Sequence, residues 1–217
     1  AEEWWDPHGR FWPLHAIQPV RMAFLEQHIG NLDGLAVLDV GCGGGILTEA
    51  LAGKGARVVG IDRAEKVLAV ARRHAEQQNL SIEYALADPI AWAEKHPEQY
   101  DLVCAMELLE HVPDPEAVIA ACARMLKPGG WFAFSTINRT PKAFAFAIVG
   151  AEYILGWLPR GTHRYEKFIR PSEAAWACRR AGLAMQALSG MCYQITRRRF
   201  TLCDDLSVNY LGLARKP

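Results

Sequence analysis

Short apolar runs alternate along the chain with segments in which apolar residues recur at helical spacing. The first run covers residues 35–40, and a glycine-rich stretch leads from it into a helical pattern over 46–52. The second run covers 57–62 and precedes a helical pattern over 64–78. The residues that share one face of this second helix are Val67, Leu68, Ala71 and Ala75. In each pair of segments, the spacing of apolar residues changes from about two residues to about 3.6 residues. This change predicts strand, helix, strand and helix in that order.

The same alternation continues toward the C-terminus. Further strands are expected at 82–86, 100–105 and 131–136, and helices at 89–95 and 115–126. The tetrapeptide Lys127-Pro128-Gly129-Gly130 predicts a helix stop and a turn. The tail predicts a helix over 171–181, then strands over 183–189 and 208–214 that complete the sheet in antiparallel orientation.

Strands that alternate with helices predict an α/β fold of the doubly wound, Rossmann-like type, with a mainly parallel seven-stranded sheet. In such folds ligands bind at the carboxyl ends of the strands. A length of 217 residues favours a single domain over the whole chain, 1–217. Its expected parts are an N-terminal arm with a helix that begins at Pro19 (1–34), a cofactor-binding core (35–137), an apolar insertion (138–170) and a C-terminal completion of the sheet (171–217).

Charge and cysteine content narrow the class of protein. Lysine plus arginine and aspartate plus glutamate number 24 each, so the formal net charge is zero and nucleic acid is not an expected partner. The six cysteines stand singly without a C-x-x-C pair, which favours reduced core residues. The chain begins without a basic start and apolar run, which predicts a cytoplasmic protein.

The glycine loop from Gly41 to Gly45 carries the strongest local signal. It joins a strand to a helix, where missing side chains let a ligand approach the backbone. Ile46 occupies the third fixed position of a dinucleotide fingerprint, and no Gly-Lys-Ser/Thr follows, so both phosphate-binding motifs are disfavoured. Asp62 ends the second strand, where an acid can accept both hydroxyls of a ribose. The two features together predict a nucleoside-like ligand, against the alternative of a tight turn and an unrelated exposed acid.

This combination resembles the class I S-adenosylmethionine-dependent methyltransferases. The shared pattern is D-x-G-x-G-G-G, from Asp39 to Gly45, with an acid at the end of the second strand. The resemblance implies S-adenosylmethionine as cofactor, with Gly41 and Gly43 beside its methionine part and Asp62 on the ribose. It also implies that Asp88 flanks the adenine.

A second constellation follows the expected strand at 100–105, within Met106 to Pro115. If this segment is helical, Glu107, Glu110 and His111 share one face and offer two oxygens and one nitrogen to a divalent cation such as Mg or Zn. The alternative is that the segment only begins a helix that packs on the sheet, with its acids solvated.

The resemblance to the ubiquinone-biosynthesis O-methyltransferases extends over nearly the whole length. The shared segments are Trp4-Trp5-Asp6, Phe11, Pro13-Leu14-His15, the glycine loop, Met106-Glu107, Leu109 to Pro115, Val149 to Leu155, Gly161-Thr162-His163, Lys167-Phe168-Ile169 and Val208-Asn209-Tyr210. It implies methylation of a catechol-type hydroxyl on a polyprenylated ring, with other quinone-synthesis enzymes as possible partners. The implied cofactor positions are Arg21, Asp39, Gly41, Gly43, Asp62, Asp88 and Met106, and the implied catalytic and metal positions are Glu107, Glu110 and His111.

Two mechanisms compete for His111. A phenol with a pKa near 10 is mostly un-ionised at neutral pH, so the reaction needs help with deprotonation. A cation held by Glu107, Glu110 and His111 would lower the pKa of the phenol, whereas an uncoordinated His111 would act as general base. We favour the metal-assisted version on the sequence.

The apolar stretch 143–158 and the N-terminal tryptophans have two interpretations each. The stretch is flanked by Lys142 and Arg160, which favours peripheral contact with the inner face of a membrane; the alternative is a buried lid. Trp4, Trp5 and Trp12 close over the cofactor or prenyl tail, or form a hydrophobic clasp.

The competing functions are a methyltransferase for another small acceptor, a non-catalytic assembly subunit and, more weakly, a nicotinamide oxidoreductase.

Overall fold

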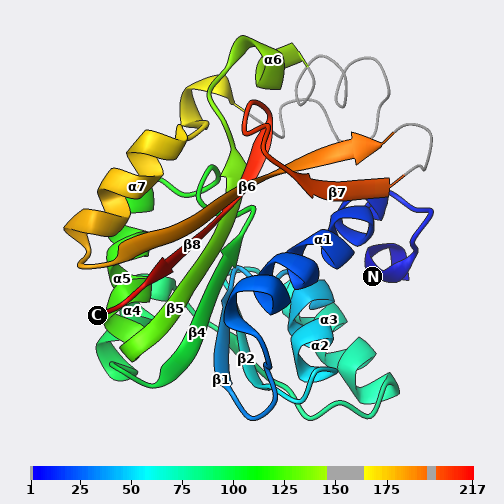
Figure 1. Cartoon of the computed structure of the whole chain (residues 1–217). Coiled ribbons are helices and arrows are strands. Elements are labelled where there is room, and N and C mark those ends of the chain that lie inside the picture. The colour runs from blue at the N-terminus through cyan, green and yellow to red at the C-terminus, as the bar shows by residue number, and fades with distance from the viewer. Residues whose placement is uncertain (1, 146–163, 195–198) are drawn as a thin grey trace.

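One mixed β-sheet organises the protein. The computed structural model describes residues 2–145, 164–194 and 199–217. Its eight-stranded sheet has the order β3-β2-β1-β4-β5-β8-β6-β7 (Figure 1). The strands are β1 Ala36–Val40, β2 Arg57–Asp62, β3 Glu83–Leu86, β4 Tyr100–Met106, β5 Leu126–Ile137, β6 Ala184–Gln194, β7 Arg199–Cys203 and β8 Asn209–Arg215. The first five pair in parallel, and β8, β6 and β7 complete the sheet in antiparallel orientation, which confirms the prediction for β6 and β8.

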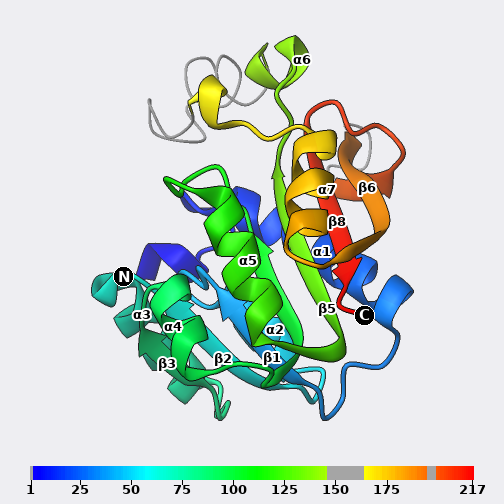
Figure 2. The same cartoon turned by 90° about the vertical axis from the view of Figure 1, so that its left-hand side faces the viewer.

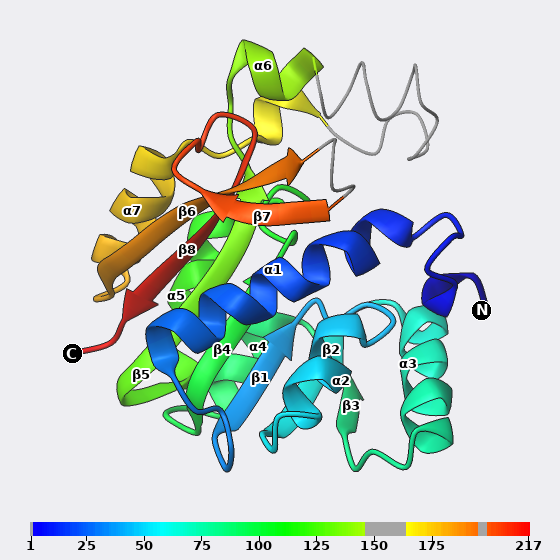
Figure 3. The same cartoon turned by 45° about the vertical axis from the view of Figure 1, so that its right-hand side comes forward.

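Helices cover both faces of the sheet. On one face lie α1 (Trp12–Ile29), α2 (Ile46–Ala52) and α3 (Glu65–Gln77), and on the other lie α4 (Pro89–Lys95), α5 (Pro115–Met125) and α7 (Pro171–Arg180) (Figures 2 and 3). The short α6 (Pro141–Ala143) and the 3₁₀ turns η1 (Glu2–Trp5) and η3 (Tyr165–Lys167) lie outside these layers. The Rossmann-like class is therefore confirmed, with eight strands rather than the seven expected.

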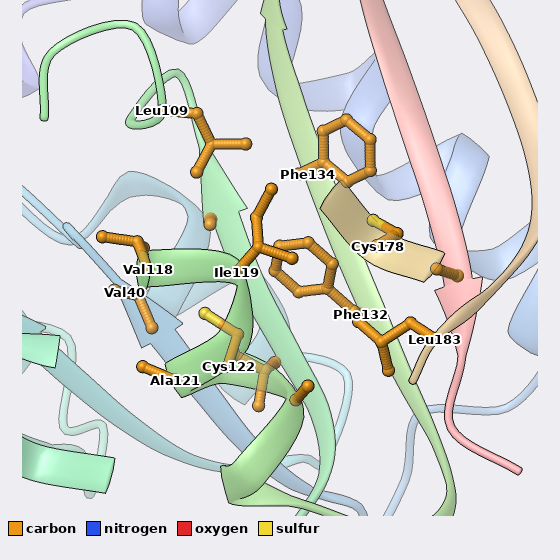
Figure 4. Packing of buried hydrophobic residues seen from close by; sticks show 14 of the residues in the cluster. Val40, Leu109, Val118, Ile119, Ala121, Cys122, Phe132, Phe134, Cys178 and Leu183 are labelled. Atoms are coloured by element: carbon orange, nitrogen blue, oxygen red, sulfur yellow. The ribbon is translucent and has the colours of Figure 1, made fainter. Parts of the chain in front are cut away.

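Alternation of side chains along the strands divides the core into two parts. Val37 packs with the α1 and α2 side, and its neighbour Leu38 packs with the α4, α5 and α7 side. Figure 4 shows the second part, in which Ile119 of α5 and Phe132 of β5 pack against each other. Burial on both faces explains why these strands are nearly continuous apolar runs.

The predicted turn at Lys127-Pro128-Gly129-Gly130 is wrong, because β5 begins at Leu126 and includes these residues. Gly129 has a φ of +77°, and the pairing register of β4 with β5 shifts between Tyr100 and Leu102. The two glycines therefore form an irregular start of the strand, like a bulge, instead of leaving the sheet.

The start of α1 and the edge of the sheet also differ from expectation. The helix begins at Trp12, and Pro19 lies inside it rather than at its start. Strand β7 was not predicted. It brings Cys203 within disulfide distance of Cys192 on β6, with 6.0 Å between the Cα atoms, and the two form a disulfide. The expectation of reduced thiols is wrong for this pair, whereas the four others are free and buried; these are Cys42, Cys104, Cys122 and Cys178.

The apolar insertion falls largely outside the described residues, since 146–163 are not among them. Of the stretch 143–158, the structure describes only residues 143–145, where Ala143 is buried and Phe144 is exposed. Within the described ranges, no helix has the length and apolar character needed to cross a membrane.

Candidate active site

A cavity of about 230 Å³ lies at the carboxyl ends of β1, β2 and β4, where the strand order reverses. Of the residues predicted to bind cofactor, Gly41, Asp62 and Asp88 line it. The turn that follows β4 supplies the opposite wall through Leu108, Val112 and other residues. The topology thus gathers residues from the carboxyl ends of four strands, β1, β2, β3 and β4, around one space.

The glycine loop is tied to the end of β2. Gly41 has a φ of +72°, and its N–H donates to the carbonyl oxygen of Ile61 over 2.8 Å. A Cβ atom on Gly41 would lie 2.8 Å from the side chain of Leu108. Glycine is therefore required here for both backbone conformation and space, and its absence of a side chain leaves the cavity open.

The Asp62 carboxylate is fixed by the backbone. Its Oδ2 accepts a hydrogen bond of 3.0 Å from the N–H of Gly43, and its Oδ1 accepts one of 2.8 Å from the N–H of Ala64. Each oxygen keeps further acceptor capacity. Asp62 is therefore a preoriented acceptor at the cavity wall, and Gly43 acts by orienting it.

Asp88 caps a helix and also lines the cavity. It is the N-cap of α4, and its Oδ1 accepts from the N–H groups of Ile90 and Ala91 over 2.9 and 3.3 Å. Ile90 lines the same cavity and is 39% exposed. This end of the cavity thus offers apolar surface for a flat ring beside a fixed carboxylate.

A buried charged cluster lies around Arg21 of α1. Arg21 is 4% exposed, and its guanidinium forms an ion pair with the carboxylate of Glu107. Burial lowers the pKa of Arg21 to about 10. Burial also raises the pKa of Asp39 to about 6, although the Thr48 hydroxyl donates to this carboxylate over 2.6 Å. Arg21 and Asp39 do not line the described cavity, and neither do Gly43 and Met106, the last residue of β4.

The segment after Met106 is not a helix. Glu107 has a φ of +47°, its N–H donates to Ser135, and turns lead from it to α5 at Pro115. The predicted common helical face of Glu107, Glu110 and His111 is therefore wrong. The backbone reverses immediately after β4, so the spacing of these residues carries no helical periodicity.

The three side chains have separate surroundings. Glu107 accepts from the Ser135 hydroxyl over 2.6 Å in addition to its ion pair with Arg21. Glu110 is 3% exposed and accepts from the Thr136 hydroxyl over 2.8 Å, and burial raises its pKa to about 7. His111 is exposed. Ser135 and Thr136 were missed by the sequence analysis, although two adjacent hydroxyl residues inside the apolar run 131–137 were a usable signal.

These residues do not fit a metal ion as they are arranged. No group of three His, Cys, Asp or Glu side chains close enough to hold a metal occurs in the part of the chain that the structure describes. An arginine cation already pairs with Glu107, and a carboxyl with a pKa of about 7 is a poor anionic ligand at neutral pH.

Trp4 and Trp5 cover the outside of the glycine loop. A Cβ atom on Gly44 would lie 2.7 Å from the indole of Trp4, and Trp5 Nε1 donates to the Gly44 carbonyl over 3.0 Å. Trp5 also stacks on the ring of His74 of α3, with 3.5 Å between ring centroids. Neither tryptophan lines the cavity, so their contacts correspond to the clasp interpretation.

Comparison with known proteins shows which family has this fold and site. A family model described as a methyltransferase domain matches residues 12–188. A ubiquinone biosynthesis O-methyltransferase from Leptothrix cholodnii is 54% identical over 217 residues, which cover 100% of this chain and 92% of that protein. The chain belongs to the ubiquinone biosynthesis O-methyltransferase family. Another member, from Azoarcus sp., is 53% identical over 216 residues, 100% of this chain and 92% of that one.

Solved structures support the fold of this family member. A protein from Pyrococcus horikoshii aligns with a TM-score of 0.71 at 16% identity, covering 98% of this chain and 94% of that one. A magnesium protoporphyrin IX methyltransferase from Synechocystis with bound SAH aligns with a TM-score of 0.69 at 20% identity, covering 94% and 84%. Fold, family model and relatives together identify an S-adenosylmethionine-dependent O-methyltransferase.

Proposed function

We propose that this protein methylates a phenolic hydroxyl of a polyprenylated, catechol-type precursor of ubiquinone. The observation that carries the proposal is the cavity lined by Gly41 and Asp62, which adjoins the turn that bears His111, in a chain of this family. The cavity suits a nucleoside, and His111, which does not itself line the cavity, directly precedes the lining residue Val112.

Three residues are proposed to hold S-adenosylmethionine. Asp62 accepts from the ribose hydroxyls, Asp88 lies at the adenine end, and Arg21 pairs with the carboxylate of the methionine part. The missing side chain of Gly41 leaves space for a ligand, and the buried Nε of Arg21 has no hydrogen-bond partner among the described residues. Both features fit a ligand that brings its own polar groups. When bound, this cofactor supplies a methyl group that the sulfonium has already activated.

The chain has to hold and deprotonate the acceptor. We assign proton removal from the acceptor hydroxyl to His111, because imidazole is the most frequent general base in enzymes and this one lies, exposed, on the turn between β4 and α5. Glu107 and Glu110 act as positioning residues, since they anchor this turn to β5 through Ser135 and Thr136. No step depends on a metal, because the arrangement of the three side chains does not fit one.

Methyl transfer to a prenylated catechol, with and without chelator, tests this function. The expected result is transfer that chelator does not stop. His111→Asn is expected to lower the rate at neutral pH by roughly 10²- to 10⁴-fold while cofactor affinity stays unchanged. The rate of the variant should recover toward pH 10, where the phenol ionises unaided. If chelator stopped transfer and added Mg²⁺ or Zn²⁺ restored it, the assignment to His111 would be wrong and a metal-assisted mechanism would take its place.

We also propose peripheral contact with the inner face of a membrane through the apolar stretch 143–158. The support is that Phe144 is 43% exposed at its start and that a polyprenylated acceptor partitions into lipid. Replacement of Phe144, Phe146 and Trp157 by alanine is expected to abolish co-sedimentation with anionic lipid vesicles. Unchanged co-sedimentation would favour a lid over the active site.

A further inference from the structure

A second cavity, of about 510 Å³, lies beside the first and is larger. Its walls come from the turn after β4, from α5, from α7 and from the segment around η3. The volume lies within the range of about 300–1,000 Å³ that is typical of small-molecule sites. Nothing in the proposed binding of the cofactor uses this space.

The walls of this cavity are mainly apolar. Leu109, Ile119 and Phe168 line it and are buried, and Figure 4 shows Ile119 of α5 against Phe132, with Leu109 on the loop after β4. Trp176 of α7 also lines it and is 47% exposed, an unusual place for a large aromatic side chain. The guanidinium of Arg180 lies 4.7 Å from the centroid of this ring, and the indole still borders the cavity.

Of the charged residues that line the cavity, four form ion pairs and Lys167 is exposed on η3; the four are Glu116, Arg139, Glu166 and Glu173. Arg139 forms an ion pair with Glu173, and its Nε donates to the carbonyl of Phe168 over 2.8 Å. Glu116 pairs with Arg180 outside the lining, at 3.3 Å. Paired charges offer little attraction to an ionic ligand, so the cavity selects for an apolar one.

The two cavities share part of their walls. Val112 and Pro113 line both of them, and both residues belong to the turn that carries His111. A ligand whose polar ring sits at this turn can therefore extend an apolar chain into the larger cavity while its hydroxyl faces the cofactor side.

We infer that the larger cavity binds the isoprenoid chain of the acceptor, at the end next to the ring. This inference rests on the proposed function and adds the subsite that recognises the lipid part of the substrate. The wall residues that the two cavities share and the mainly apolar lining favour this occupant. Each methylene that leaves water contributes roughly fourfold to affinity, so a single isoprene unit in the cavity should be readily detected.

Catechols that carry no, one, two or three isoprene units test the inference. KM is expected to fall at least tenfold between the bare catechol and the compound with two units. Ser172→Trp places an indole in the cavity from an exposed position on α7 and should abolish this difference, with turnover of bare catechol unchanged. The matched control is Ser81→Trp, which alters an exposed serine outside the cavity and should preserve the difference.

Farnesol with the unaltered enzyme provides a measurement that does not depend on a variant. It should raise KM for the prenylated acceptor without raising KM for bare catechol. Equal KM values for all four catechols, or a chain-length preference that survives in Ser172→Trp, would overturn the cavity assignment alone. Absence of transfer to every catechol by an enzyme that binds S-adenosylhomocysteine would overturn the proposed function and the subsite with it.

Discussion

Glu110→Gln is expected to stabilise the protein in a pH-dependent manner. The carboxyl of Glu110 is buried, and its Oε1 has no hydrogen-bond partner among the described residues. Burial raises its pKa from 4.5 to about 7, so the folded state favours the protonated form. Its contribution to stability is therefore fully present below pH 4.5 and is lost as the pH rises through 7. Glutamine resembles the protonated form at every pH.

The magnitude follows from these two pKa values. A pKa that rises from 4.5 to about 7 on folding corresponds to about 3 kcal/mol of stability, of which about 2.5 kcal/mol is lost between pH 5 and pH 8. The amide N–H of glutamine also lacks a partner, but this cost does not change with pH. The quantity to compare is therefore the change, between the two pH values, in the difference between variant and wild type.

Urea denaturation at pH 5 and pH 8 measures this change. The expected result is a free energy of unfolding that rises, relative to wild type, by about 2.5 kcal/mol more at pH 8 than at pH 5. Glu94→Gln, on the exposed side of α4, is the control and should stay within about 0.5 kcal/mol at both pH values. A Glu110→Gln difference that is equal at both pH values would refute the reasoning.

Three further perturbations have distinct expected outcomes. Asp62→Ala should raise the dissociation constant of S-adenosylhomocysteine roughly 30- to 150-fold in calorimetry, because a charged acceptor for hydroxyl groups is lost; unchanged binding would exclude its ribose role. Gly41→Ala should lower both the free energy of unfolding and cofactor affinity. Gly34 has a similar φ of +75°, and a Cβ atom there would meet no described atom within 4 Å, so Gly34→Ala should lower only the free energy of unfolding, by about 1 kcal/mol. Reduction of the Cys192–Cys203 disulfide should lower the free energy of unfolding by about 3 kcal/mol, and Cys203→Ser should show no response to reductant.

The sequence predicts the parallel half of the fold closely, because each strand there is a self-contained apolar run. The predicted segments 46–52, 57–62 and 89–95 coincide with α2, β2 and α4. The antiparallel half is harder to predict from the sequence. The existence of β7 depends on its pairing with β6 and its contact with α1, and local periodicity does not encode either.

The site divides in the same way. Gly41 and Asp62 could be located from sequence because each directly follows or ends a strand, and the sheet fixes such positions in space. The surroundings of Glu107 and Glu110 could not, because a residue with positive φ replaces the expected helix and the partners Ser135 and Thr136 come from another strand. A turn of this kind is determined by tertiary hydrogen bonds.

The clasp of Trp4 and Trp5 on the glycine loop has a consequence for the order of folding. Their partners are Gly44, in the loop before α2, and His74, on α3. Both indoles therefore leave the ribosome well before the surface on which they pack has been synthesised. The arm can dock only after the β1-α2-β2-α3 unit has formed. In a variant whose other five tryptophans are replaced by phenylalanine, fluorescence during refolding would therefore report the docking of Trp4 and Trp5 on the glycine loop.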